Sequence, residues 1–165
     1  MICLDTHILI WGVRGFASPG QEAMIGRARR YIQWLRLTGR QVMIPAPVVA
    51  EYLVDEDPAR RREGGIFEVA FEMPPFDLPA AALAAEIHRD RDLVRFVRES
   101  FDRSRQAIKT DVMILAIAIH RQADALVTHD VDILRRLARG RIEVVQIPEI
   151  PANVDDRQAD LFGED

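Results

Sequence analysis

The feature that most constrains the fold is the segment from Lys109 to Asp132, KTDVMILAIAIHRQADALVTHDVD. Its first half has apolar residues at helical spacing, which predicts a helix that begins close to Asp111. Its second half, an apolar run from Ala125 to Val127 followed by polar residues, predicts a buried strand that ends in an acidic loop. In open parallel sheets, ligands bind outside the carboxyl ends of the strands. Because helix and strand run antiparallel, we expect Asp111, Asp130 and Asp132 at that edge.

Short apolar runs predict three more buried strands, at 2–4, 42–44 and 143–147. Helices are predicted between them, over Gln21–Thr38, Val48–Val54, Ala80–His88, Arg89–Arg105 and Ile133–Arg139, with a short helix from His7 that Gly12 and Gly15 break. Residues 57–79 are ambiguous, because Ile66–Met73 alternates like a strand. For that segment we favour a helix that ends before Pro74 and a short strand near Phe76–Leu78. These alternating elements indicate an α/β fold.

Length and composition fit one globular domain. The chain has 165 residues, of which 48% are apolar, enough for a three-layer core. The single cysteine, Cys3, excludes a disulfide framework and suits a reducing, cytoplasmic setting. The apolar N-terminus carries Asp5 and is too short to span a bilayer, so no membrane association is expected. Residues 148–165 are rich in acids and proline, and we expect a partly disordered tail there.

The net charge of −4 comes from that tail. Residues 149–165 hold six acids and one arginine, whereas the first 148 residues hold 21 basic and 20 acidic residues. Arginines cluster in residues 27–40, 60–62 and 89–105, and such stripes can follow a phosphate backbone. For any single cluster, however, a solvated helix face is the favoured interpretation.

Four acids lie at or near predicted element boundaries: Asp5, Glu51, Asp111 and Asp130. Carboxylates gathered without basic partners repel each other unless a hard divalent cation neutralises them, so the sequence predicts a Mg²⁺ or Mn²⁺ site. Such an ion activates water for attack on a phosphodiester. The hydroxyls of Thr6 and Thr128 are suited to holding a carboxylate or a phosphate, and Lys109 can add positive charge. The competing interpretation makes Asp5 or Asp111 a helix cap or a turn former. The four histidines lack zinc spacing, so surface or capping roles are favoured for them, and Trp11 and Trp34 are assigned to the core or to subunit contacts.

The segments LDTHILIW, PAPVVAEYL, KTDVMILAIA and VTHDVDIL, in this order, make residues 1–147 resemble a PIN domain, and within that superfamily the VapC-type toxins. The resemblance implies a three-layer α/β/α fold with a central, mostly parallel sheet. It also implies a Mg²⁺- or Mn²⁺-dependent endoribonuclease whose acids are Asp5, Glu51, Asp111 and Asp130, with Asp132 as an auxiliary acid. A homodimer and a cognate antitoxin are further implications. His7 and Ile133 depart from the usual Asn and Phe, which affects substrate handling more than catalysis.

Two alternatives stay open at this point. A PIN scaffold that has lost turnover would bind only RNA or a protein partner, but the presence of all four acids argues against it. A phosphatase-like Mg²⁺ site would use Asp5 as a phosphoryl acceptor, but Thr6 and His7 follow Asp5 where that chemistry needs another acid. The sequence does not identify the RNA, because the choice of cleavage site depends on groove shape and loops.

Overall fold

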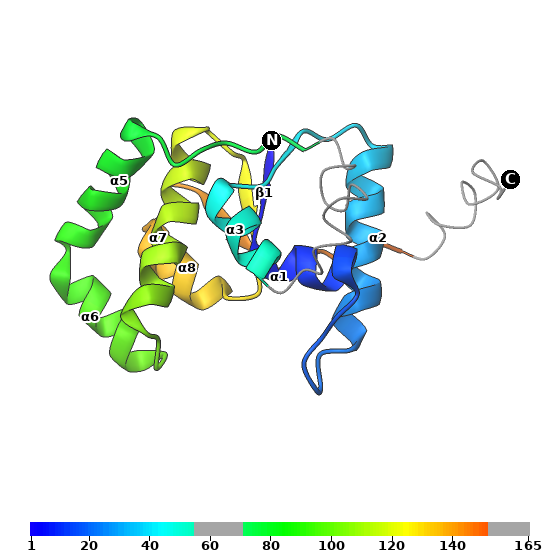
Figure 1. Cartoon of the computed structure of the whole chain (residues 1–165), viewed down its shortest axis with the longest axis horizontal. Helices are drawn as coiled ribbons and strands as arrows, with labels where there is room; N and C mark the ends of the chain where they lie inside the picture. Colours follow the sequence, from blue (N-terminus) through cyan, green and yellow to red (C-terminus); the bar gives the residue numbers. More distant parts are fainter. Residues whose placement is uncertain (55–70, 152–165) are drawn as a thin grey trace, which may run out of the picture.

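The computed structural model of the chain describes residues 1–54 and 71–151, and its centre is a parallel sheet (Figure 1). The strands are β1 (Ile2–Leu4), β2 (Val42–Met43), β3 (Ala125–Val127) and β4 (Glu143–Val145), in the order β2-β1-β3-β4. All three strand pairs are parallel, and their register aligns Leu4 with Val127 and Val127 with Val145. The carboxyl ends of β1, β3 and β4 therefore meet at one edge, as predicted.

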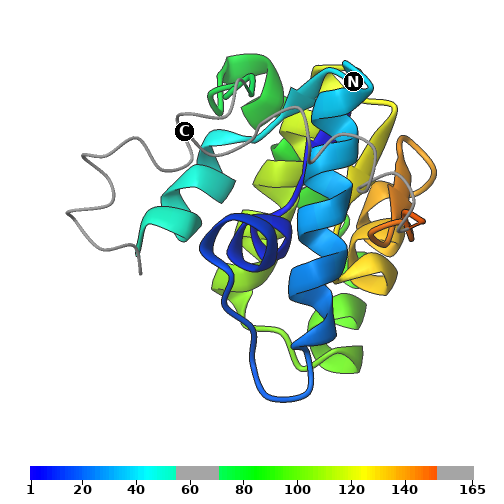
Figure 2. The ribbon, with the colours of Figure 1, turned by 90° about the vertical axis from the view of Figure 1, so that its right-hand side faces the viewer.

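Helices cover both faces of this sheet. Cys3, Met43 and Leu126 pack into a core with α3 (Ala46–Val54), α5 (Leu78–Arg89), α6 (Arg91–Ser100), α7 (Arg105–His120) and α8 (Val131–Ala138). Leu4 and Val127 pack into a second core with α1 (Thr6–Leu9), a π-helical turn (Ile10–Arg14) and α2 (Ala23–Leu37). Figures 1 and 2 show α2 on one side of β1 and α7 on the other. The predicted three-layer α/β/α fold is confirmed.

The helix α7 begins earlier than predicted. Ser104 caps it by accepting a hydrogen bond from the backbone N–H of Ala107 at 3.0 Å, and the first helical residue is Arg105. Asp111 therefore lies inside the helix rather than at its start. The prediction was wrong because the polar residues from Arg105 to Thr110 hide the helical pattern, of which Ile108 is the buried member.

The glycine at position 12 does not break the first helical segment. The chain continues through Gly12 to Gly15, whose φ of 72° ends the segment. A Cβ atom at Gly12 would lie 2.4 Å from Ile32 Cδ1, so its absence allows α2 to pack closely against this segment. Gly12 is thus a packing residue rather than a helix breaker.

The other boundaries in the described ranges lie within two residues of the predictions, with two exceptions. The arginine-rich helix α6 covers only Arg91–Ser100. The prediction of a strand near Phe76–Leu78 is wrong, because Asp77 caps α5 by accepting a hydrogen bond from the Ala80 N–H at 3.1 Å. The extended contact in this region is instead an isolated parallel bridge between Glu72 and Met43. The helix preferred before Pro74 falls mainly on residues outside the described ranges, as does most of the acidic tail. Within the described ranges, no helix is long and apolar enough to cross a membrane.

Candidate active site

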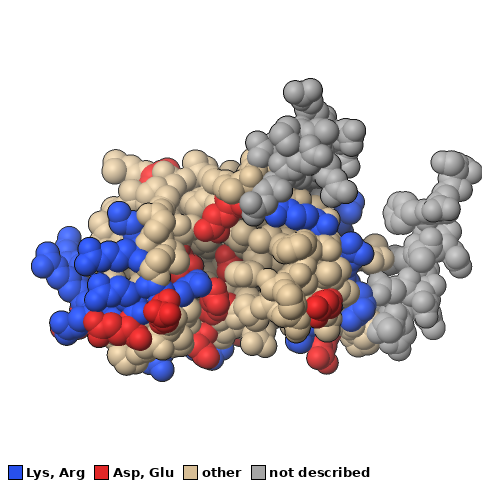
Figure 3. Space-filling model, turned by 60° about the horizontal axis from the view of Figure 1, so that its bottom comes forward, with Lys and Arg blue, Asp and Glu red and all other residues tan. Residues whose placement is uncertain are grey.

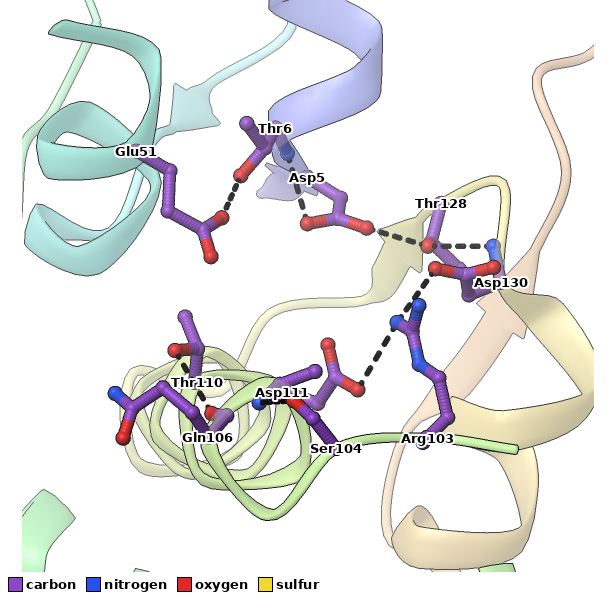
Figure 4. A network of polar contacts seen from close by, with 11 residues as sticks. Asp5, Thr6, Glu51, Arg103, Ser104, Gln106, Thr110, Asp111, Thr128 and Asp130 are labelled. Atoms are coloured by element: carbon purple, nitrogen blue, oxygen red, sulfur yellow. Dashed lines mark hydrogen bonds and ion pairs between the residues drawn. The ribbon is translucent and has the colours of Figure 1, made fainter. Parts of the chain in front are cut away.

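Asp5 and Thr128 are the centre of the site. They follow the adjacent strands β1 and β3, whose last residues are paired in register. The Thr128 hydroxyl donates to Asp5 Oδ2 at 2.6 Å and accepts from the Asp130 backbone N–H at 3.0 Å. The other Asp5 oxygen, Oδ1, accepts from the Thr6 N–H at 2.7 Å. One hydroxyl therefore links the ends of two strands and fixes the Asp5 carboxylate (Figure 4).

Thr6 and Glu51 form the next part of the site. Helix α3 follows β2 and carries Glu51 on its exposed side, although most of that helix is apolar. The Thr6 hydroxyl donates to Glu51 Oε2 at 2.5 Å. Glu51 thus avoids the cost of burial by lying at the open edge, where it is bonded to the residue that follows Asp5.

Asp111 and Asp130 share a basic partner, which corrects the prediction that the acids lack one. Arg103 Nη2 donates to Asp130 Oδ2 at 2.8 Å and to Asp111 Oδ2 at 3.3 Å. Arg103 comes from the turn between α6 and α7, directly after Asp102, which has a φ of 47°. Its Nε atom is buried and has no hydrogen-bond partner. In Figure 4 the guanidinium lies between the two carboxylates.

The charges at this edge are not balanced. Burial raises the pKa of the Asp111 carboxyl to about 7; the charge of Arg103 opposes that rise, whereas the charges of Asp5 and Asp130 add to it. Burial alone would lower the pKa of Arg103, but Asp111 and Asp130 together raise it. The pKa of Asp111 therefore shows that the contact with Arg103 does not offset the cost of burying this carboxylate.

The buried polar side chains of the described residues are concentrated here. Among those residues, the buried polar or charged ones are Asp5 (6% exposed), Thr6 (8%), Asp111 (9%) and Thr128 (0%), and all four belong to the predicted site. Burying a carboxylate is costly, so a fold selected for stability alone would place apolar residues at these positions. Their concentration at one sheet edge indicates a functional site.

The remaining predicted residues lie around this centre. Asp132 is exposed in the first turn of α8 and lines a hollow of about 510 Å³ with His129 and Asp130. The structure does not bring Lys109 to the acids, because it lines a separate pocket with His88 on α5. His7 and His129 are half-buried rather than surface residues, and the His129 ring lies edge-on to the buried Trp11 with centroids 5.1 Å apart.

The chemistry of the donors fits a divalent cation. The site offers carboxylate oxygens, which Mg²⁺ and Mn²⁺ prefer, and a guanidinium already occupies the space between two of them as a positive charge. In the arrangement described, however, no three His, Cys, Asp or Glu side chains of residues 1–54 and 71–151 are gathered tightly enough to hold an ion. The site thus suits a divalent cation in its charge and in the type of its oxygen atoms, but Arg103 lies between two of the carboxylates that would bind the ion.

The comparison with known families decides the assignment. The family model of the PIN domain matches residues 2–140. The chain belongs to the PIN-domain family. PIN domains are generally nucleases, so this PIN domain belongs to a family of hydrolases that act on nucleic acid. None of the curated proteins matches its sequence significantly.

A solved structure gives the same fold. The crystal structure of VapBC2 from Rickettsia felis, bound to a DNA fragment from their promoter, contains a similar chain with a TM-score of 0.59. The two chains are 17% identical, and the match covers 88% of this PIN domain and 98% of that chain.

The competing interpretation of the acids as caps is correct for one of them. Asp5 caps α1 through the Thr6 N–H while it also accepts from Thr128. Asp130 occupies the N-cap position of α8 but its side chain makes no capping hydrogen bond, and Asp111 lies in the middle of α7. In this PIN domain, two of the three aspartates therefore have no capping role.

Arg103 is the site residue that the sequence analysis missed. It was grouped with the arginines of 89–105 as part of a solvated face. The available signal was Ser104, since a serine followed by a helical segment is a common N-cap. With Ser104 as the cap, Arg103 would have been placed in the turn that leads into the helix carrying Asp111.

Proposed function

We propose that this PIN domain is a divalent-metal-dependent endoribonuclease that hydrolyses RNA phosphodiester bonds with an activated water. The observation that carries the proposal is the concentration of buried polar groups, Asp5, Asp111 and Thr128 among them, at the carboxyl edge of the sheet. That edge is where open α/β sheets bind ligands. The membership in a nuclease family and the raised pKa of the buried Asp111 carboxyl support the same conclusion.

Asp5, Glu51, Asp111 and Asp130 would hold the ion, with Asp132 in support. A bound Mg²⁺ or Mn²⁺ supplies a nucleophilic water at neutral pH and neutralises charge on the attacked phosphate. Thr128 and the Thr6 N–H hold one lone pair of each Asp5 oxygen, which leaves the remaining lone pairs directed toward the edge. Arg103, held by Asp111 and Asp130, places a positive charge where a substrate phosphate would enter.

A cleavage assay with matched variants tests this function. The wild-type protein should cleave single-stranded RNA in Mn²⁺ or Mg²⁺ and lose that activity in excess EDTA. Asp5→Asn should reduce the rate by at least ~100-fold, as expected for the loss of a group that acts directly on the reacting centre. Asp92→Asn is the control, because Asp92 is exposed on α6 and pairs only with Arg95 among the described residues. Full cleavage in EDTA, or by Asp5→Asn, would refute the metal mechanism.

We further propose that the protein is the toxin of a toxin–antitoxin pair, acting in the cytoplasm as a homodimer and neutralised by a cognate antitoxin. Support comes from the similarity of its fold to a chain of the VapBC2 structure. Expression of the wild-type gene alone should arrest growth, whereas Asp5→Ala should not. Co-expression of the neighbouring small reading frame should restore growth, and light scattering should give the mass of a dimer. Equal growth with the wild-type and Asp5→Ala genes would contradict the toxin proposal.

A further inference from the structure

A second concave site lies between α5, α6 and α7, apart from the acidic edge. Its volume is about 370 Å³, and its polar lining is entirely basic. The basic residues are His88, Arg91, Arg95, Arg98, Arg105 and Lys109. The apolar part of the lining is Val94 and Ile108. We name this pocket the basic groove. Figure 3 shows lysine and arginine side chains gathered over this part of the molecule, with acidic side chains at the lower edge of the cluster and others nearer the middle.

The positive charge of the basic groove is mostly uncompensated. On α6, Arg95 pairs with Asp92 at 2.8 Å and the half-buried Arg98 pairs with Glu99 at 3.1 Å. Within the described ranges, Arg91, Arg105 and Lys109 form no ion pair, and all three are exposed. The pKa of His88 is lowered, first by burial and then by the charge of Lys109. A solvated helix face usually mixes both signs of charge, so a one-sign hollow of this kind indicates an anionic ligand.

The basic groove and the acidic edge share the helix α7. Arg105 and Asp111 are six residues apart, which is about 9 Å along a helix axis. Lys109 and Asp111 are two residues apart and point to different sides of α7, since neighbouring helical residues are about 100° apart. The turn that carries Arg103 lies between the end of α6 and the start of α7. Arg105 at the start of α7 lines the groove, and Arg103, two residues before it, contacts Asp111 and Asp130.

We infer that the basic groove binds the backbone phosphates of the RNA strand on one side of the bond to be cleaved. This inference rests on the proposed function and assigns part of the substrate to a second surface. The arginine and lysine side chains of the lining can bind several phosphates, and the apolar Val94 and Ile108 can contact a ribose or a base edge. Within this lining there is no aromatic ring for stacking apart from His88, so the groove should hold RNA with little preference for sequence.

The test compares two triple variants that remove the same charge. The groove variant is Arg91→Gln, Arg105→Gln and Lys109→Gln. The control variant is Arg29→Gln, Arg36→Gln and Arg40→Gln, all exposed in or just after α2 on the other side of the sheet. All six positions are exposed, so both variants should fold, and thermal melts check that they do. Binding of a labelled single-stranded RNA is measured by anisotropy in EDTA over a range of salt, and cleavage is measured separately in Mn²⁺.

The groove variant should bind RNA at least ~10-fold more weakly than the control variant at 0.1 M salt. The slope of log K against log salt should fall by about 2, since each lost phosphate contact on a single strand contributes about 0.7. Equal affinities of the two variants would overturn the inference. Displacement of the RNA by polyglutamate as effectively as by unlabelled RNA would also overturn it, because the groove would then take acidic protein segments.

The same experiment separates this inference from the proposed function. RNA binding that depends on the basic groove, without cleavage by the wild-type protein in Mn²⁺, would support the groove and refute the nuclease. Cleavage by the wild-type protein, with equal RNA binding by both variants, would support the nuclease and refute the groove. A wild-type protein that neither binds nor cleaves RNA would refute both.

Discussion

Replacing Asp111 by asparagine should stabilise the metal-free protein at neutral and higher pH. The pKa of its carboxyl is about 7 in the folded protein, compared with an ordinary value of 3.8. That difference in pKa corresponds to roughly 4 kcal/mol of destabilisation of the folded protein at a pH where Asp111 is ionised in both the folded and the unfolded state. Asparagine removes the charge but weakens the 3.3 Å contact with Arg103, a loss of about 1 kcal/mol. We therefore expect Asp111→Asn to raise the free energy of unfolding by about 2–3 kcal/mol at pH 8.

The pH dependence identifies the cause. Near pH 3 and below, Asp111 is protonated in the folded protein and largely protonated in the unfolded chain, so its contribution becomes small. As the pH rises from 3 to 7, the unfolded chain ionises first, and the wild-type protein loses stability relative to the variant. The difference levels off once the pH is well above 7. Urea unfolding in EDTA at pH 4.5 and pH 8 measures it, and Asp92→Asn, the exposed control, should change stability by less than about 0.5 kcal/mol at both values.

Adding Mn²⁺ should stabilise the wild-type protein more than the Asp111→Asn variant. An ion that binds only the folded state stabilises it by an amount that grows with its affinity, and Asp111→Asn removes one of its ligands. Mn²⁺ should therefore stabilise the wild-type protein more than the variant, while RNA cleavage by the variant is lost. The reasoning is refuted if Asp111→Asn is less stable than wild type at pH 8 in EDTA, because Asp111 would then be a stabilising partner of Arg103.

Three further variants test the surrounding contacts. Asp130→Asn should lower the free energy of unfolding in EDTA by about 1 kcal/mol, because Asp130 is half-buried and pairs with Arg103 at 2.8 Å. This change is opposite in sign to that expected for Asp111→Asn. Urea unfolding measures it, and a gain in stability would contradict it. Arg103→Gln should increase the rise in melting temperature that Mn²⁺ produces, since the ion no longer competes with a guanidinium, and an unchanged or smaller rise would show that Arg103 and the ion do not share the site. Thr128→Val should cost about 1–3 kcal/mol and lower cleavage at least ~10-fold, because it leaves Asp5 Oδ2 and the Asp130 N–H without their Thr128 partner. Thr110→Val, which loses only a hydroxyl bond to the Gln106 carbonyl, should change both far less.

The sequence predicted the sheet and its acidic edge because both depend on local patterns. Apolar runs such as Ala125–Val127 mark buried parallel strands, and the polar residues that follow must then lie at the carboxyl edge. Asp5, Asp130 and their neighbouring threonines were therefore placed correctly. Asp111 was placed at the correct edge for an incomplete reason, since the helix that carries it starts six residues earlier than its apolar pattern indicates.

The contacts that determine the charge balance at the acidic edge could not be predicted from the sequence. Arg103 is one of many arginines in residues 89–105, and only the turn at Asp102 and the cap at Ser104 direct its side chain to the acids rather than to solvent. Lys109 illustrates the reverse error. It lies two residues before Asp111, and closeness in sequence suggested a shared site, but helical geometry turns it toward the basic groove.

The position of Arg103 explains how the fold tolerates its acidic edge before an ion or substrate is present. Asp5 and Asp111 are buried, and the repulsion among these carboxylates would lose the attraction that offsets it if the guanidinium between Asp111 and Asp130 were removed. A lysine or arginine fixed within a helix would compensate that repulsion permanently and would exclude a metal ion. Arg103 instead projects from a turn with a 27% exposed side chain, so under the proposed function it could exchange these carboxylates for a phosphate once a divalent cation bound them. The contact with Arg103 therefore reduces the cost of burying Asp111 without removing it. Such a site can stay folded without a metal ion and still bind one.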